Sequence, residues 1–485
     1  MTLPPQWTLA PLGDLTTRIV GGGTPSKALS ANFTGAIPFM TVKDMKARFV
    51  DSTVDHISED AISASATTMV PADTLIVATR MSLGKIVRPK VAVAINQDLK
   101  ALFLGEGVEK TFIEYFWRSK SQAIQAIGTG TTVKGIRLED IRALAVPLAP
   151  KNEQKRIADK LDTVLTRVDA INTRLARAAP LLKRFRQSVL AAATSGRLTE
   201  DWRATKDLPP MTEQALTATR LQSGCSKKDA RITGELIERG CHLSPNKLIP
   251  PTWIGTCIGM SGVVSNGSTP SRSEPSYWGG AIPWVSSGEV RNNRIGATKE
   301  SISQLGFESS SVKLLPVGSV LVAMIGEGKT RGQSGLLDIA ATINQNVAAV
   351  TPNEALIESE YLWFWFQSQY EANREAGNGT GPQALNCQKV RELPLNLPPL
   401  QEQVEIVRRV ETLFAFADRL EARLQTAQTA ANRLTPALLA KAFRGELVPQ
   451  DPNDEPASEL LKRLAGSAPV GGIKRGRKRT SDAST

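Results

Sequence analysis

One stretch of this sequence has the residue spacing of a phosphate-binding loop. Ala323–Thr330 reads AMIGEGKT and carries the glycines, the lysine and the threonine that hold phosphate oxygens in such loops. That chemistry also needs a helix whose first N–H groups face the phosphate. Arg331–Gly335 (RGQSG) opposes a helix, and the matching stretch Thr79–Ile86 lacks the final threonine. We therefore expect a basic surface loop here and no nucleotide site.

Other catalytic chemistries find too few residues in this chain. The only histidines are His56 and His242, and none of the 4 cysteines lie two or three positions apart. Zinc knuckles and mechanisms that need paired histidines are therefore not expected. The sequence also lacks the acidic-Pro-Pro-aromatic tetrad of adenine methyltransferases, their glycine-rich methyl-donor loop and a carboxylate-plus-lysine nuclease cluster. We expect a chain with no catalytic residue and no metal site of its own.

Length and charge favour a multidomain chain with an anionic partner. The chain has 485 residues and a formal net charge of +12, so at least two domains are expected. The basic excess is concentrated in 151–195 and in the tail, while 251–398 is slightly acidic. This makes nucleic acid a plausible partner. The tail residues that we expect to form a disordered basic arm are Lys474, Arg475, Arg477, Lys478 and Arg479.

The same composition indicates a cytoplasmic protein. No run of eighteen apolar residues occurs, so no membrane span is expected. The first twelve residues lack the basic segment and apolar core of a secretory signal. The few cysteines fit a reducing compartment.

An internal repeat decides the organisation of the chain. Short segments in the first half recur in the same order in the second half. The matched pairs are Pro4–Trp7 with Pro250–Trp253, Thr24–Ser26 with Thr269–Ser271, Ile37–Phe39 with Ile282–Trp284, Ile95–Asp98 with Ile343–Asn346, Glu153-Gln154 with Glu402-Gln403, and Gly196–Leu198 with Gly445–Leu447. Each copy begins with a region of short apolar runs, such as Thr74–Thr79, separated by Gly/Pro/Ser turns, with fewer helical stretches. This pattern predicts a mixed α/β domain in each copy.

Each copy ends in a long amphipathic helix. Apolar residues recur at alternating steps of three and four over some five heptads, which is typical of a coiled coil. The seam residues that we expect to pair the helices are Ile157, Leu161, Val164, Val168, Leu175 and Leu182 in copy one, and Ile406, Val410, Leu413, Leu420, Leu424 and Leu434 in copy two. We expect the two helices to pair antiparallel. Pro180 and Pro436 should each kink or interrupt its helix.

The repeat gives a fold class and domain boundaries. We predict an α+β protein with two similar mixed α/β recognition domains, joined by two long antiparallel coiled-coil helices in a pseudo-twofold arrangement. The boundaries are 1–150 for the first domain, 151–195 for its helix, 196–250 for a linker, 251–398 for the second domain, 399–445 for its helix, and 446–485 for a mostly disordered tail. Two similar domains at a fixed separation suit a ligand with two half-sites, such as duplex DNA.

This plan resembles the specificity subunits of type I restriction-modification enzymes. The motifs that carry the resemblance cover roughly residues 4–450. They are Gly22–Ser26 with Ile37-Pro38, Gly267–Ser271 with Ile282–Trp284, Pro398–Gln403 opening a helix, and Ala442–Leu447 closing one. The resemblance implies a non-catalytic chain whose two target-recognition domains each read one half of a bipartite asymmetric site in double-stranded DNA.

The resemblance also implies partners and their cofactors. The paired helices would set the spacer and dock two adenine-N6 methyltransferase subunits, and restriction/translocase subunits would join for ATP-dependent cleavage. S-adenosylmethionine, ATP and Mg²⁺ would be bound by those partners and not by this chain. Two alternatives stay open at this point: the specificity chain of a two-component methyltransferase-nuclease, and a coiled-coil scaffold without a DNA role.

Base reading requires side chains of the Arg, Lys, Asn, Gln or Ser type on rigid loops. The candidates are Lys43, Arg48, Arg80, Lys85, Arg88 and Lys90 in copy one, and Arg291, Arg294, Lys329, Arg331 and Gln333 in copy two. Among these we expect Arg331 to be the strongest, since it lies on a glycine-flanked loop beside Lys329.

Overall fold

A computed structural model describes residues 3–128, 135–222, 226–240, 249–326, 329–375 and 385–467. The chain forms two compact units. The residues of unit 1 are Met1–Ala176 with Thr426–Thr485, and those of unit 2 are Arg177–Gln425. No helix among the described residues is long and apolar enough to cross a membrane.

The strands of unit 1 form a five-stranded sheet in the order β2-β10-β7-β8-β4 and a four-stranded sheet in the order β5-β3-β9-β6, with β1 paired to β11. Their bounds are β1 (Thr8–Pro11), β2 (Thr16–Gly21), β3 (Ile37–Met40), β4 (Phe49–Val50), β5 (Asp55–Ile57), β6 (Thr68–Val70), β7 (Leu75–Ala78), β8 (Ile86–Pro89), β9 (Val93–Ile95), β10 (Leu99–Leu104) and β11 (Ala145–Leu148). The apolar run predicted as a strand at Thr74–Thr79 is β7, whose four residues are all buried.

Unit 2 repeats this topology. Its five-stranded sheet has the order β13-β20-β17-β18-β15, a smaller sheet has the order β16-β14-β19, and β12 pairs with β21. The bounds are β12 (Ile254–Cys257), β13 (Gly262–Asn266), β14 (Trp278–Val285), β15 (Asn293–Ile295), β16 (Glu300–Ile302), β17 (Val320–Ala323), β18 (Ser334–Leu337), β19 (Thr342–Ile343), β20 (Val347–Pro352) and β21 (Pro394–Leu397). The duplicated mixed α/β architecture is therefore confirmed, although β6 of unit 1 has no counterpart among the described strands of unit 2.

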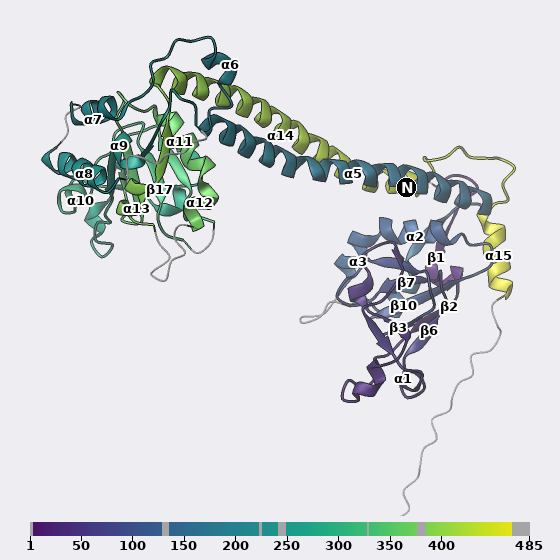
Figure 1. The fold of residues 1–485 in the computed structure, drawn as a ribbon. Coiled ribbons are helices and arrows are strands. Elements are labelled where there is room, and N and C mark those ends of the chain that lie inside the picture. The colour runs from purple at the N-terminus through teal and green to yellow at the C-terminus, as the bar shows by residue number, and fades with distance from the viewer. Residues whose placement is uncertain are drawn as a thin grey trace, which may run out of the picture. The chain divides into compact units, whose positions relative to one another are not determined.

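Short helices complete each unit (Figure 1). In unit 1 they are α1 (Glu59–Ser63), α2 (Lys110–Ser119), α3 (Ser121–Ile127), α4 (Leu138–Arg142) and α15 (Ala457–Ser467). In unit 2 they are α6 (Glu200–Arg203), α7 (Glu213–Gln222), α8 (Lys227–Glu238), α9 (Ile258–Ser261), α10 (Gln304–Glu308), α11 (Ser359–Ser368), α12 (Tyr370–Glu375) and α13 (Cys387–Glu392). The aromatic residues of α2 and α11 are buried in the main cores, so these helices fix the domains against the long helices.

The long helices are α5 (Lys151–Thr194) and α14 (Leu400–Ala442), and each contributes residues to both units. In unit 1 the start of α5 meets the chain that follows α14, because Arg156 pairs with Asp454 at 2.6 Å. In unit 2 the later part of α5 meets the first half of α14, because Arg186 pairs with Asp418 at 2.5 Å. These contacts make the two helices antiparallel.

Two details of the predicted helices need correction. Neither Pro180 nor Pro436 interrupts its helix, since α5 and α14 are each continuous, whereas a kink at either residue stays a prediction. The seam residue Leu434 is 42% exposed, while Leu439 is buried. A straight α-helix drifts by about 20° per heptad relative to a strict seven-residue repeat, so the buried stripe moves to neighbouring positions.

The segments after both helices are more structured than expected. The described residues of the 196–250 linker form three helices, and Leu216 and Leu236 from α7 and α8 lie in the core of unit 2. The described part of the tail, 446–467, contains α15, which buries Leu460 in unit 1. Both segments are anchored alike, because Ala457 N–H donates to the Gln6 carbonyl at 2.9 Å and Met211 N–H to the Thr252 carbonyl at 3.1 Å. The basic arm at 474–479 lies outside the described residues.

Glycine closes both helices at equivalent positions. Gly196 and Gly445 have φ values of +80° and +76°, which side chains rarely adopt. A Cβ atom on them would lie 2.3 Å from Pro250 and 2.4 Å from Pro4, respectively. Each helix therefore turns back onto the Pro-Pro motif that begins a globular domain.

Candidate nucleic-acid interface

Each globular domain is fixed to a long helix by the same buried hydrogen bond. The Trp7 indole donates to Glu153 at 2.9 Å, and the Trp253 indole donates to Glu402 at 2.9 Å. Burial raises the pKa of the Glu153 carboxyl despite that indole contact. The glutamine after each glutamate accepts one backbone N–H and donates to a backbone carbonyl. These repeated motif residues are therefore structural anchors that hold the recognition surfaces in place.

Arg48 and Arg88 are used inside the first domain, which corrects the expectation that they contact DNA. Arg48 bonds to the fully buried Glu114 at 2.8 Å and to Asp162 of α5 at 2.5 Å. Arg88 reaches Glu114 at 3.5 Å and Asp73 at 2.5 Å. Burial alone would lower the pKa of Arg48, but the hydrogen bonds to Glu114 and Asp162 raise it above its ordinary value. A buried carboxylate needs such partners, so these cations hold the fold together.

The other four cations predicted in copy one are exposed. Lys43 follows β3, and Arg80 follows β7 with its side chain 59% exposed and 3.9 Å from Asp98. Lys85 donates to the Met45 carbonyl at 3.1 Å at the start of β8. Lys90 directly follows the other end of β8 and pairs with Asp51, which is exposed. Because β7 and β8 are antiparallel, Arg80 and Lys85 lie at the same end of these two strands, and Lys90 lies at the opposite end.

In copy two the structure separates the five predicted residues. Arg294 reaches Asp338 at 3.0 Å and Glu360 at 3.1 Å, so it anchors β15 in the way that Arg48 anchors β4. Arg291 is exposed and donates to the Gly288 carbonyl at 2.6 Å. Lys329 and Gln333 lie with Arg294 along one groove. Of these three, Lys329 is exposed, Gln333 is half-buried and Arg294 is held by its two ion pairs.

Arg331 is buried, which corrects the expectation that it is the best base-contacting residue. It exposes 7% of its surface, whereas Leu83 on the corresponding β7–β8 loop exposes 4%. Both residues directly precede a glycine with positive φ, and these glycines pack in equivalent places, Gly84 against α3 and Gly332 against α12. The arginine therefore occupies a core position under the loop and does not present its guanidinium to a ligand.

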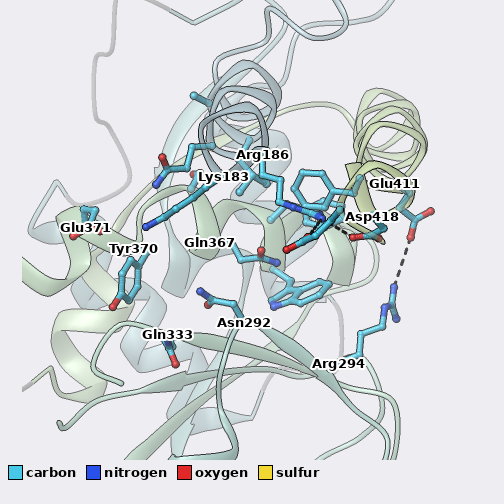
Figure 2. Close-up of a pocket in the computed structure, with 18 of the residues that line it drawn as sticks. Lys183, Arg186, Asn292, Arg294, Gln333, Gln367, Tyr370, Glu371, Glu411 and Asp418 are labelled. Carbon is cyan, nitrogen blue, oxygen red and sulfur yellow. Dashed lines mark hydrogen bonds and ion pairs between the residues drawn. The ribbon is translucent and has the colours of Figure 1, made fainter. Parts of the chain in front are cut away.

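A groove of about 980 Å³ lies between α5, α14 and the globular part of unit 2 (Figure 2). The sequence reasoning missed most of its polar residues. Those able to bond base edges or phosphates are Lys183, Asn292, Gln367, Tyr370 and Arg374. The Tyr370 hydroxyl donates to the Lys329 carbonyl at 2.7 Å, so α12 holds the loop of Lys329 in place. Carboxylates of α14, such as Glu411 and Asp418, line the helix side and would repel phosphate. Charge therefore favours nucleic acid at the loop side of this groove.

The loop side is the edge where several strands end. In unit 1, β10 is antiparallel to both β2 and β7, so the ends of β2 and β7 meet the turn before β10. At this edge the Thr24 hydroxyl donates to Gln97 at 2.5 Å, and Thr269 bonds to Gln345 in the same way in unit 2. Both glutamines are exposed. The repeated Thr-Pro-Ser and Ile-Asn-Gln motifs thus build one exposed polar pair in each domain. The recurrence of these motifs in both copies is the sequence feature from which the pair could have been predicted.

Glycine permits this construction. A Cβ atom on Gly22 would lie 1.8 Å from the Ile95 carbonyl oxygen, and one on Gly267 would lie 1.8 Å from that of Ile343. Only glycine allows the loop after β2, or β13, to cross so close to the neighbouring strand end. The Gly-Thr-Pro-Ser motif is therefore a scaffold for the recognition edge.

Catalytic and cofactor sites are not evident in the described parts of the chain. There, no three His, Cys, Asp or Glu residues are placed to hold a metal ion. The phosphate-loop pattern after β17 leads into the antiparallel strand β18, not into a helix, as far as the described residues show. Such a connection does not supply the helix N-terminus that a nucleotide phosphate requires.

These features define a class of proteins: two equivalent mixed α/β domains, each anchored to one of two antiparallel helices, with loops of matching construction at one strand edge. The family model described as type I restriction modification DNA specificity domain matches residues 4–178 and 260–427. The chain belongs to this family.

Known relatives agree with this assignment. The chain is 32% identical to the type I restriction enzyme EcoBI specificity subunit of Escherichia coli, over 74% of this chain and 72% of that protein. It is 27% identical to the EcoDI specificity subunit of Escherichia coli, over 99% of both chains. The crystal structure of the HsdS subunit from Thermoanaerobacter tengcongensis shares the fold, with a TM-score of 0.56 at 17% identity, over 92% of this chain and 98% of that chain.

Proposed function

We propose that this chain is the DNA-reading subunit of a type I restriction-modification complex and that each globular domain reads one half of a bipartite asymmetric site. The observation that carries the proposal is the repetition, in both units, of the strand order in the five-stranded sheet and of the Trp–Glu anchor. Two equivalent readers on one chain suit a ligand with two separated half-sites. The different exposed side chains on the equivalent loops, such as Arg80 and Lys329, allow the two readings to differ.

The helices supply the second part of the proposal. Since α5 and α14 each continue through both units, we propose that they set the spacer between the half-sites and dock two methyltransferase subunits. Adenine-N6 methylation and ATP-dependent cleavage would then be carried out by methyltransferase and restriction/translocase subunits. S-adenosylmethionine, ATP and Mg²⁺ would be bound by those partners, and the complex would work on DNA in the cytoplasm.

Reconstitution tests this proposal. The full chain, the methyltransferase subunits, and both together are incubated with genomic DNA and S-adenosylmethionine, and methylated adenines are mapped by sequencing. We expect methylation only in the combined reaction, at one site made of two defined half-sites and a fixed spacer. Methylation by the purified chain alone, or methylation with the same pattern when the chain is left out, would refute it.

A further inference from the structure

The loop between β7 and β8 presents an unusual methionine. Met81 has a φ of +62° and exposes 72% of its surface. Few non-glycine residues adopt this backbone conformation, and asparagine or glycine is the common choice. A flexible apolar side chain that is this exposed gains little from its contacts with the described part of this domain. Its placement therefore suggests a partner that covers it.

The second domain has a matching feature. Ile325 lies on the equivalent loop between β17 and β18 and is 48% exposed. It is followed by Gly326, whose φ of +141° is again outside the range of ordinary residues. Both loops thus carry an exposed apolar side chain just beyond the end of the central strand, although the loops differ in length and sequence. This recurrence argues that the apolar tip belongs to what the two domains do in common.

The surroundings of Met81 are cationic. Arg80 precedes it, Lys100 lies at the start of β10, which pairs with β7, and Lys43 follows β3 of the smaller sheet. Among the described residues, these three cations outnumber the one acid that an ion pair places beside them, Asp98, which lies 3.9 Å from Arg80. Partial burial lowers the pKa of the Lys100 ammonium, and the positive charge of Arg80 lowers it further. An isolated apolar tip among cations matches a ligand that is anionic outside and apolar inside. Duplex DNA has this construction, with phosphates flanking stacked bases.

We propose that Met81 inserts between stacked base pairs of the half-site read by the first domain while Arg80 and Lys43 hold the flanking phosphates. The inference rests on the proposed function and adds a deformation of the DNA to it. Methionine and isoleucine are among the side chains that wedge between base steps and kink a duplex. Ile325 would act in the same way at the other half-site. Sequence preference would then depend partly on which base step unstacks easily.

Fluorescent bases test the insertion. Once the site is known, 2-aminopurine or pyrrolocytosine replaces one base at a time in both half-sites, omitting the adenines that become methylated. The full chain is bound with its methyltransferase partners. We expect fluorescence to rise several-fold at one step of each half-site. Met81→Gly, which suits the positive φ and removes the side chain, should abolish the rise in the first half-site only, and Met81→Leu should keep it.

The outcomes separate this inference from the proposed function. A rise that survives Met81→Gly, or no rise in the wild-type complex, would overturn the insertion while specific binding is retained. If replacing one thymine by uracil weakens the wild-type complex and not Met81→Gly, then Met81 contacts a methyl group in the groove and does not insert. If Met81→Gly loses only methyltransferase binding, the tip is a protein contact. A wild-type complex that does not prefer its own site over unrelated DNA would remove the proposed function itself.

Discussion

Arginines with similar sequence surroundings have different tasks in this molecule. Arg80 is exposed beside a strand end, whereas Arg331 lies in a core position. We expect Arg331→Ala to destabilise unit 2 by about 1–3 kcal/mol, as is usual when a large buried side chain is removed, without changing the recognised sequence. Urea unfolding and the methylation profile measure the two effects. Lys329→Ala, on the exposed part of the same loop, is the control for stability. Relaxed specificity at full stability would restore Arg331 as a base reader.

The stability that Asp454 in the tail contributes should depend on pH. Asp454 accepts hydrogen bonds from Arg156 at 2.6 Å and Asn152 at 3.1 Å, and its side chain is 4% exposed. The Arg156 bond lowers the pKa of this carboxyl below its ordinary 3.8. Its contribution to stability is therefore complete above pH 3.8 and is lost as the pH falls through the lowered value.

We expect Asp454→Asn to lower the melting temperature of the full chain by several degrees at pH 7, since a hydrogen bond to a charged group contributes about 1.5–3 kcal/mol. The difference from wild type should shrink below pH 3.8. Melting curves at pH 7 and below pH 3.8 measure the difference in melting temperature, and hydrogen exchange of α15 shows whether the tail is the part that is destabilised. Glu459→Gln, which breaks an exposed pair with Lys462, should change little. Equal effects at both pH values would contradict the role of the Asp454 charge.

At the scale of elements, burial decides how much each seam residue contributes. Leu161 is fully buried in unit 1, whereas Leu424 is only half-buried. We expect Leu161→Asp to cost several kcal/mol, because it buries a charge without a partner, and Leu424→Asp to cost clearly less. Denaturant unfolding followed by circular dichroism compares the two. Ile171→Asp, at a position that is 45% exposed, is the control. Equal losses for all three variants would show that the burial pattern does not govern pairing.

The repeat made most of the elements predictable from sequence. Motifs recurring in order, such as Glu153-Gln154 and Glu402-Gln403, required two equivalent domains and two equivalent helices. The helix α15 was missed because its apolar residues, among them Leu460, are few and follow a polar, Pro-rich stretch. The start of α15 and the segment before α7 are equivalent because they make equivalent backbone hydrogen bonds. Such bonds do not require particular side chains, so the sequence does not reveal them.

The candidate site was harder to predict, for a physical reason. Basic side chains are equally suited to ion pairs and to DNA phosphates, and only the position of acids such as Glu114 and Asp162 distinguishes the two uses. Those acids lie far from Arg48 in sequence. By contrast, the Thr24–Gln97 pair was visible as a repeated motif whose chemistry could have been considered.

At the scale of the whole molecule, helix length should determine the spacer. Deleting one heptad from the middle of both α5 and α14 keeps the seam in phase and shortens each by about 10 Å at 1.5 Å per residue. We expect the same half-sites with a spacer that is shorter by about three base pairs, at about 3.4 Å each. Mapping of methylated adenines measures the spacer. Deleting the heptad from one helix only should abolish activity, and an unchanged spacer in an active double deletion would mean that the helices do not set it.

Domain exchange tests the modularity of the two readers. Replacing 251–398 with the corresponding segment of a relative should change one half-site and leave the other intact, because each domain has its own sheets and its own anchor. The structure adds a condition to this experiment. Two residues of the preceding helices belong to the same domain, since Leu216 and Leu236 pack in its core. Arg220 also donates to the Gly262 carbonyl at 3.3 Å.

We therefore expect the exchange of 210–398 to give a stable chain and the exchange of 251–398 to give a less stable one with the same new specificity. Thermal unfolding and methylation mapping of both hybrids measure the two properties. The half-site read by 1–150 serves as the internal control, because unit 1 has its own core. A change in that half-site would refute independent reading. Equal stability of the two hybrids would show that the packing of α7 and α8 against the second domain does not depend on its sequence. The segment 196–250 would then act as a linker, as predicted from the sequence.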